Sequence, residues 1–157
     1  MARQTVVRTS SVAAPAQAVW ARVGSVEGVN HELGPWLRMT VPGRARGLRL
    51  DGLELGRPAG RSWVLLGGIL PIDYDEVTIV ERGPLRFLER SPMGSMRFWE
   101  HERTVVARGP GESEVRDRLT FEPRLPGAGR AARWLIERIF AHRQRRLVEW
   151  FARDAGR

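Results

Sequence analysis

The sequence predicts an α+β domain in which a strongly bent antiparallel sheet of about seven strands wraps around one long C-terminal helix. Three observations lead to this prediction: two short helices follow the first strand, a series of strands with tight turns fills the middle of the chain, and an amphipathic helix ends it. Consecutive strands with tight turns form antiparallel sheets, and a single long helix buries its apolar stripe against one face of such a sheet. We treat residues 1–157 as one domain because this length fits a single hydrophobic core.

The first part of the chain combines a strand with two short helices. Residues 4–12 alternate and are rich in Thr, Val and Ser, which is typical of a strand. A helix starts at Ala14-Pro15, where the missing N–H of proline costs little, and ends at Gly24. A second short helix is expected over 25–32, and Gly34-Pro35 breaks it.

The middle of the chain reads as strands separated by glycine and proline. The segment 47–56 is the weakest of them, because its leucines do not keep one parity. Gly67 and Gly68 interrupt an apolar run, and we interpret them as a sharp bend within one strand. The cluster Asp73-Tyr74-Asp75-Glu76 reads as a solubilising strand end. The predicted strands span residues 36–41, 47–56, 61–70, 74–81, 86–91, 96–107 and 114–122.

The last element is a long helix that begins near Gly129. Its apolar residues recur at three- and four-residue steps, which predicts one buried stripe, interrupted only at Arg143. The stripe should face the sheet. The positions expected to be buried are Ile136, Phe140, Leu147 and Phe151, and those expected to be exposed are Arg138 and Arg145.

Composition excludes several classes of protein. The chain has no cysteine, hence no disulfide, thiol nucleophile or thiolate metal site. Three scattered histidines without helical i,i+4 spacing do not indicate zinc, and the sequence predicts neither a metal nor another cofactor. No apolar run is long enough to span a membrane, and no secretory signal is visible, so we expect a cytoplasmic protein.

Charge is the other unusual feature of the composition. The net charge is +8, and all 26 basic residues are arginine. The final helix is especially rich in arginine, which in general can attract nucleic acid or anionic lipid. We interpret it instead as a solvated helix face and expect no specific nucleic-acid partner.

The hairpin over 96–122 carries the most informative pattern. Because side chains alternate along a strand, His101 and Arg103 share one face with Trp99. On the next strand Asp117 shares the apolar face with Leu119 and Phe121. The opposite faces carry acidic residues on one strand and arginines on the other, and we expect these charges to pair across the strands. The residues of that outer face are Glu100, Glu102, Arg116 and Arg118.

An aspartate on an apolar face is costly unless it is paired. Parity allows two registers, one with His101 opposite Asp117 and one with Arg103 there. We therefore predict that the Asp117 carboxylate contacts His101 or Arg103 within hydrogen-bond reach. The pair is either a structural link between two strands or an acid/base pair in a pocket, and the structural interpretation is favoured for it.

These elements, together with the residues that occupy them, resemble the SRPBCC superfamily of START-like, helix-grip ligand-binding domains, in its polyketide cyclase/dehydrase-like branch. The resemblance extends from Val6 to Phe151 and rests on residues 14–20, 99–103, 117–121, 140–143 and 146–147. It implies binding of a lipid, polyketide or aromatic molecule between the sheet and the final helix. It does not imply catalysis, because many members only bind or carry a ligand.

The sequence thus predicts a binding protein for a hydrophobic small molecule. The first alternative is a polyketide cyclase or dehydratase that uses His101 and Asp117 as candidate catalytic residues, and the second is an arginine-rich module for nucleic acid or anionic lipid. The oligomeric state has no signature in the sequence. The expected ligand-binding residues are Trp63, Leu65, Trp99, His101, Arg103, Asp117, Leu119, Phe121, Ile136 and Phe140.

Overall fold

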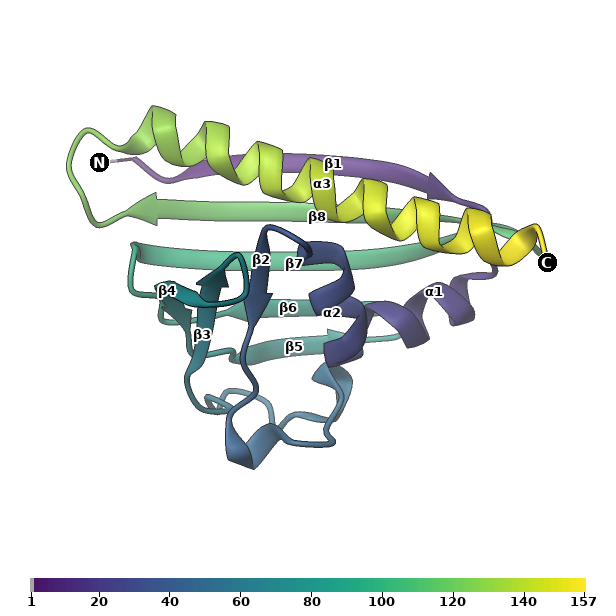
Figure 1. The fold of residues 1–157 in the computed structure, drawn as a ribbon, viewed down its shortest axis with the longest axis horizontal. Coiled ribbons are helices and arrows are strands. Elements are labelled where there is room, and N and C mark those ends of the chain that lie inside the picture. Colours follow the sequence, from purple (N-terminus) through teal and green to yellow (C-terminus); the bar gives the residue numbers. More distant parts are fainter. Residues whose placement is uncertain (1) are drawn as a thin grey trace.

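The computed structural model describes residues 2–157 and contains two antiparallel sheets, two short helices and one long helix (Figure 1). The larger sheet has five strands in the order β1-β8-β7-β6-β5, and the smaller has three in the order β2-β3-β4. The elements are β1 (Gln4–Val12), α1 (Ala16–Val23), α2 (Val26–Leu33), β2 (Leu37–Met39), η1 (Gly43–Ala45), η2 (Leu50–Gly52), β3 (Ser62–Leu66), β4 (Leu70–Asp75), β5 (Ile79–Gly83), β6 (Arg86–Arg90), β7 (Met96–Gly109), β8 (Glu112–Pro123) and α3 (Gly129–Ala155).

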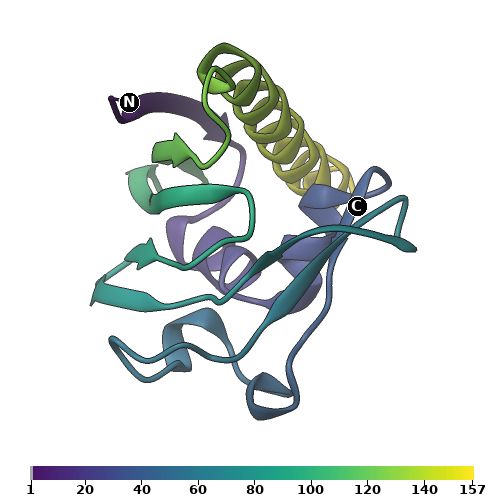
Figure 2. The same ribbon diagram turned by 90° about the vertical axis from the view of Figure 1, so that its left-hand side faces the viewer.

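The predicted α+β helix-grip architecture is confirmed. The five-stranded sheet curves, α3 runs along the side of β1 and β8, and the three-stranded sheet closes the opposite side (Figures 1 and 2). Helix α2 packs against α3, between that helix and the small sheet. The space enclosed by these layers is where the candidate site lies.

The long helix buries the stripe that its spacing predicts. Ile136, Phe140, Leu147 and Phe151 are all buried, with Gln144 as the one polar member of the row. Arg138 and Arg145 are exposed, as expected. Near the start of α3, Ile136 and Phe140 pack with Leu119 and Phe121 of β8 and with Val6 of β1. Burial of these large apolar side chains stabilises the contact by about 1.5–3 kcal/mol each.

Two sequence-based strand assignments are wrong in the region that builds the small sheet. The predicted strand 61–70 is a hairpin, because Gly67 and Gly68 have φ values of 62° and 80° and reverse the chain between β3 and β4. The predicted strand 74–81 is broken after Asp75. Residues between β4 and β5 bond to the 91–92 segment instead: the Glu76 N–H donates to the Pro92 carbonyl and the Thr78 N–H to Ser91 Oγ.

The segment 47–56 is not a strand either. It contains η2 and irregular turns, which place Leu50 and Leu53 toward the interior and leave Leu48 and Leu55 exposed. The leucines of this segment lack a common parity because the chain turns here and does not extend as a strand.

The outer face of the long hairpin pairs differently from the expectation. Glu102 lies opposite Arg118 and Glu100 lies opposite Thr120. The arginines that bond these glutamates belong to the neighbouring strand β6: Arg86 donates to Glu102 at 2.6 Å and Arg90 to Glu100 at 2.6 Å. Cross-strand charge pairing is therefore present, with β6 rather than β8 as the partner strand.

Candidate functional site

A cavity of about 190 Å³ lies between the five-stranded sheet, α2, α3 and the small sheet. Its wall is mostly apolar, with side chains from α2, β2, η2, β3, β6, β7 and α3. Concave apolar cavities with a few polar groups are the usual form of small-molecule sites. The volume suits a small ligand, because an engineered apolar cavity of about 150 Å³ accommodates benzene.

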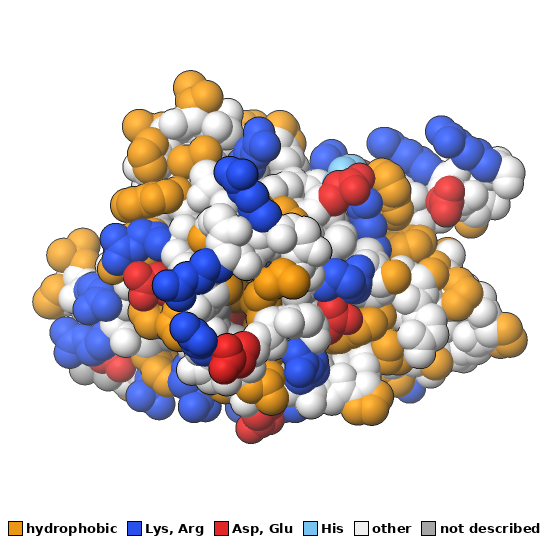
Figure 3. Space-filling view, turned by 90° about the horizontal axis from the view of Figure 1, so that it is seen from below, with side chains coloured by type: hydrophobic (Ala, Val, Ile, Leu, Met, Phe, Trp, Pro, Cys, Tyr) orange, Lys and Arg blue, Asp and Glu red, His pale blue; other side chains and the backbone are white. Residues whose placement is uncertain are grey.

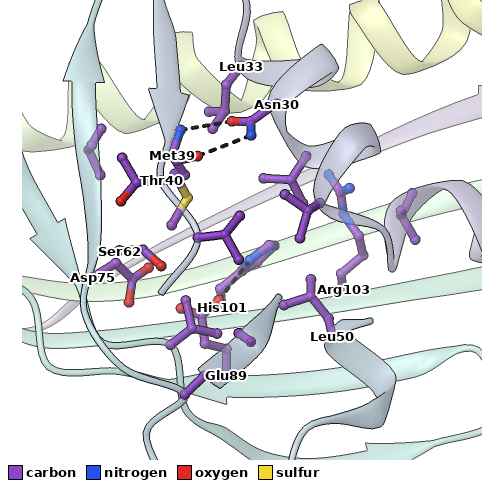
Figure 4. A pocket seen from close by; sticks show the side chains of 18 of the residues that line it. Asn30, Leu33, Met39, Thr40, Leu50, Ser62, Asp75, Glu89, His101 and Arg103 are labelled. Atoms are coloured by element: carbon purple, nitrogen blue, oxygen red, sulfur yellow. Dashed lines mark hydrogen bonds and ion pairs between the residues drawn. The ribbon is translucent and has the colours of Figure 1, made fainter. Parts of the chain in front are cut away.

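The wall of the cavity is held in place by side-chain bonds to the backbone. Asn30 of α2 accepts from the Met39 N–H at 2.8 Å and donates to its carbonyl at 3.1 Å, so β2 is fixed to α2 (Figure 4). Ser25 caps α2 by accepting from the Gly28 N–H at 3.0 Å. These bonds orient the apolar side of α2, including Val29 and Leu33, toward the cavity.

The segment between η1 and β3 closes the side of the cavity nearest the surface. Leu48, Leu53 and Ala59 line both the cavity and a surface depression that is bordered by Arg44 and Arg57. On this face of the molecule, charged and hydrophobic side chains lie around a hollow (Figure 3).

Behind the cavity, buried ionic groups link four elements. Arg103 of β7 binds Asp117 of β8 in bidentate fashion, at 2.7 Å and 2.8 Å, and its remaining nitrogen donates to Glu32 of α2 at 2.8 Å and 3.0 Å. Gln144 of α3 donates to the second Asp117 oxygen at 2.8 Å. Each of these side chains is at most 1% exposed. We call Glu32, Arg103, Asp117 and Gln144 the ionic cluster.

In the ionic cluster, the attraction between opposite charges offsets the unfavourable effect of burial on each charged group. Burial would raise the pKa of Asp117, but the charge and hydrogen bonds of Arg103, with the bond to His101, hold it well below the ordinary value. Burial would likewise lower the pKa of Arg103, but Asp117 and Glu32 keep it above the ordinary value. Both groups are therefore ionised at neutral pH, and both oxygens of Asp117 accept hydrogen bonds from side chains of the protein.

The predicted contact of Asp117 with His101 or Arg103 is confirmed, and both residues make it. The register places Arg103 opposite Asp117 and His101 opposite Leu119. Even so, His101 Nε2 lies 2.7 Å from Asp117 Oδ1. Arg103 therefore contacts Asp117 as its direct cross-strand neighbour, and His101 contacts it as a diagonal neighbour. Both of the contacts that parity allowed are formed.

A second buried polar group faces the cavity. Asp75 at the end of β4 and Glu89 of β6 both line it and are 7% and 8% exposed. Ser91 Oγ donates to Glu89 Oε1 at 2.8 Å, and His101 Nδ1 lies 3.7 Å from Glu89 Oε2. No residue in the described part of the chain provides a hydrogen-bond partner for Asp75 Oδ1. We call Asp75 and Glu89 the carboxyl pair.

The two carboxyls of this pair titrate in opposite directions. Burial, followed by the charge of Glu89, raises the pKa of Asp75 well above its ordinary value. Burial also acts to raise the pKa of Glu89, but the hydrogen bond and charge of His101 outweigh it and the result is a lowered pKa. Burial therefore favours the protonated form of Asp75, whereas the hydrogen bond and charge of His101 favour the ionised form of Glu89.

Half of the ligand-binding residues predicted from the sequence line the cavity: Trp99, His101, Arg103, Ile136 and Phe140. Asp117, Leu119 and Phe121 are fully buried and lie outside the cavity lining, since they pack between the sheet and α3. Trp63 and Leu65 also lie outside it. Their neighbours Ser62 and Val64 line the cavity, so alternation turns Trp63, which is 42% exposed, and Leu65 away from it.

Sequence reasoning missed Glu32, Asp75 and Glu89. Glu89 shares strand parity with Phe87, and this acidic residue on an apolar face was the available signal. Asp75, interpreted as part of a solubilising strand end, is interior because β4 ends there. Glu32 has no local signal in the sequence, because its partner Arg103 is 71 residues away. Within residues 2–157, no group of acidic or histidine side chains is arranged to hold a metal ion.

Comparisons with known proteins agree with this architecture. The model of a family described as "Domain of unknown function (DUF8410)" matches residues 10–151. Among curated protein sequences, none matches the chain. None of the helices in the described part of the chain is both long and apolar enough to cross a membrane.

Several solved structures have the same fold. A START superfamily protein from Mycobacterium smegmatis is 16% identical, with a TM-score of 0.71, over 95% of this chain and 97% of that one. The ZhuI aromatase/cyclase from Streptomyces sp. R1128 is 13% identical, with a TM-score of 0.73, over 98% and 96%. Norcoclaurine synthase from Thalictrum flavum is 11% identical, with a TM-score of 0.70, over 98% and 97%. At these identities the likeness establishes the fold.

Proposed function

Because this chain belongs to the family described as Domain of unknown function (DUF8410) and has the START-like fold of the SRPBCC superfamily, we propose that it binds a small hydrophobic molecule in the cavity between the sheet and α3. The observation that supports this most is the cavity itself, a space of about 190 Å³ with a mostly apolar wall. Apolar surface that stays open in a folded core forgoes dispersion contacts, which a ligand of matching shape restores.

The ligand class follows from the lining. Phe87, Trp99 and Phe140 contribute aromatic side chains to the wall of the cavity, and most of the other lining side chains are aliphatic. Aromatic side chains pack favourably with flat rings in offset or edge-to-face arrangements. An aromatic or similarly flat apolar molecule of one or two rings fits this lining and volume.

A paired substitution on β3 tests the proposal. Val64 lines the cavity and Leu65, the next residue, does not. Val64→Trp should fill the space and weaken binding of 2-methylnaphthalene by more than about tenfold in equilibrium dialysis, a loss of about 1.4 kcal/mol. Leu65→Trp adds the same side chain outside the cavity and should bind as the wild type does.

Three outcomes would overturn the proposal. One is that the wild type binds neither 2-methylnaphthalene nor 2-naphthol, its hydroxyl analogue. Another is that Val64→Trp, with an unchanged melting temperature, binds as tightly as the wild type. The last is that Leu65→Trp loses as much affinity as Val64→Trp, which would locate binding elsewhere.

An enzyme using the same cavity is the second candidate function. It is favoured by the presence of ionisable groups in an otherwise apolar wall, His101 with Glu89 and Asp75. In the sequence-based version of this hypothesis His101 acted with Asp117. Asp117 does not fit that role, because it has no free acceptor position and no access to the cavity. A cyclase or dehydratase would instead use His101 with Glu89 as the base. Turnover of a polyketide-like substrate, lost in Glu89→Gln, distinguishes this function from binding alone.

The arginine-rich helix leaves interaction with nucleic acid or anionic lipid as the third possibility. Several of its arginines already have partners within the fold: Arg133 with Glu137, Arg143 with Glu32, and Arg146 with the His31 carbonyl. These contacts favour the interpretation as a structural, solvated helix face, and we expect no specific nucleic-acid binding at physiological salt.

A further inference from the structure

The arginine that interrupts the apolar stripe of α3 lies in the wall of the cavity. The α3 residues that line the cavity are separated by three or four positions and therefore share one face of the helix: Ile136, Ile139, Phe140 and Arg143. The side chain of Arg143 is 12% exposed, and its guanidinium carbon lies 4.9 Å from the centre of the Phe140 ring. This face of α3 therefore brings a cation beside an aromatic side chain of the cavity wall.

Among residues 2–157, three arginines line the cavity, and they differ in how many of their donors are bonded. Arg103 donates from all three guanidinium nitrogens to carboxylates, and Arg49 does so to one carboxylate and to two backbone carbonyls of α1. Within the same residues, the guanidinium of Arg143 makes one hydrogen bond, from Nε to Glu32 at 3.3 Å. The four N–H groups on its two terminal nitrogens are left for another acceptor.

Glu32 does not depend on Arg143 to balance its charge. Both carboxylate oxygens of Glu32 accept from Arg103, at 2.8 Å and 3.0 Å, and these bonds are shorter than the one from Arg143. Arg146 separately joins α3 to α2 by donating to the His31 carbonyl at 2.9 Å. A structural role therefore explains the Nε bond of Arg143 and leaves its terminal N–H groups unexplained.

Cationic donors in the wall of an apolar cavity suit an anionic acceptor on the ligand, because charge-assisted hydrogen bonds are the stronger ones. A guanidinium presents its N–H groups in a planar fork that matches the two oxygens of a carboxylate. We infer that Arg143 binds the carboxylate of a flat, apolar carboxylic acid whose ring packs beside Phe140. This inference rests on the proposed function and specifies the class of ligand.

The other charges of the wall set the orientation of such a ligand. In the described part of the chain, the acidic residues that line the cavity are Asp75 on β4 and Glu89 on β6. A carboxylate beside Glu89 meets repulsion, whereas one beside Arg143 meets an opposite charge. The carboxylate therefore lies at α3. The ring is then beside Phe140 and Trp99, whose ring centres are 6.5 Å apart.

Two probes of similar shape separate the contribution of the carboxylate from that of the ring. 2-Naphthoate carries a carboxylate where 2-methylnaphthalene carries a methyl group, and it is ionised at pH 7 because carboxylic acids titrate near pH 4. In equilibrium dialysis, Arg143→Met should bind 2-naphthoate more than about tenfold less tightly than the wild type, the loss expected for hydrogen bonds to a charged group. Its affinity for 2-methylnaphthalene should stay within about twofold of the wild type, because methionine keeps the apolar stem of the side chain.

Arg145 provides the matched control on the same helix. It is exposed, so Arg145→Met removes the same charge from the protein without changing the cavity. This variant should bind both probes as the wild type does. The melting temperature of Arg143→Met should be close to that of the wild type, because Glu32 keeps both of its bonds to Arg103.

Arginine side-chain ¹⁵N NMR on the wild type gives a second measurement, which is independent of any effect of substitution on folding. The guanidinium signals of Arg143, assigned by their loss in Arg143→Met, should shift more with 2-naphthoate than with 2-methylnaphthalene. Equal shifts with the two probes would contradict a contact with the carboxylate.

The outcomes separate this inference from the proposed function. If neither probe binds the wild type, the proposed function itself fails. If 2-methylnaphthalene binds and 2-naphthoate does not, the cavity is a binding site for uncharged molecules and the role of Arg143 is wrong. Its role is also wrong if Arg143→Met binds 2-naphthoate as tightly as the wild type. Equal losses in Arg143→Met and Arg145→Met would attribute binding of the anion to the net charge of the protein and overturn the inference.

Discussion

The ionic cluster and the carboxyl pair are both buried and both contact His101, yet they differ in how completely their atoms are bonded. His101 Nε2 meets Asp117 of the cluster at 2.7 Å, and its Nδ1 lies 3.7 Å from Glu89 of the pair. Both oxygens of Asp117 accept hydrogen bonds, whereas Asp75 Oδ1 has no hydrogen-bond partner among residues 2–157. Complete bonding indicates a structural role for the ionic cluster, whereas the carboxyl pair contributes ionisable groups to the wall of the cavity.

The location of the two groups agrees with this division. The ionic cluster joins α2, β7, β8 and α3, which are the elements that grip the long helix. In the carboxyl pair, Asp75 ends β4 of the small sheet and Glu89 belongs to β6 of the large one, and both line the cavity. A buried network that is fully satisfied fixes one arrangement of the elements around it. The same residue types therefore serve different purposes a few ångströms apart.

The largest effect is expected from breaking the cluster. Asp117→Asn should lower the free energy of unfolding by about 3 kcal/mol, because Arg103 stays buried with only Glu32 to balance its charge. Affinity for 2-methylnaphthalene should change little, since Asp117 does not reach the cavity. Urea denaturation and equilibrium dialysis on one preparation measure both quantities. An unchanged stability together with lost binding would reverse the roles assigned to the two groups.

A smaller, pH-dependent effect is expected from the pair. Because the pKa of Asp75 is raised in the folded state, the folded protein holds a proton that the unfolded chain releases near pH 4. Stability contributed by this group is therefore present at acid pH and lost as pH rises toward the folded pKa. The loss is about 1.4 kcal/mol for each unit of the shift.

Asp75→Asn removes this titration and should stabilise the protein at pH 8 relative to the wild type, with little difference below pH 4. Melting temperatures measured across this range provide the test. Equal differences at both ends of the range would show that Asp75 does not retain its proton on folding.

Strand parity predicted the cluster better than the pair, and the reason is local geometry. Alternation runs through most of β7 and β8, so the positions of His101, Arg103 and Asp117 on one face follow directly from the sequence. The register between β7 and β8 depends on the turn that joins them, and this turn allows either His101 or Arg103 opposite Asp117. The bond from Arg103 to Glu32 joins segments 71 residues apart, and no local pattern indicates it.

The cavity wall on β3 and β4 was predicted poorly because the chain reverses at Gly67-Gly68 and leaves the sheet after Asp75. Parity places Trp63 and Leu65 on one face of β3, and this face points away from the cavity, which Ser62 and Val64 line instead. The break after β4 also transfers the chain from the small sheet to the large one. Asp75 owes its position in the cavity to this transfer, which depends on tertiary contacts of the 91–92 segment with Glu76 and Thr78.

Carboxyl ¹³C NMR on protein labelled at its aspartates is the most direct test of the different roles of the two groups. The side-chain signals of Asp75 and Asp117 report protonation and hydrogen bonding at each carboxyl. At neutral pH the Asp75 signal should have the position of a protonated acid and should shift when 2-naphthol is added. The Asp117 signal should have the position of a carboxylate and stay unchanged. An Asp117 signal that moves with ligand while that of Asp75 does not would contradict the assignment of one group to the fold and the other to the ligand.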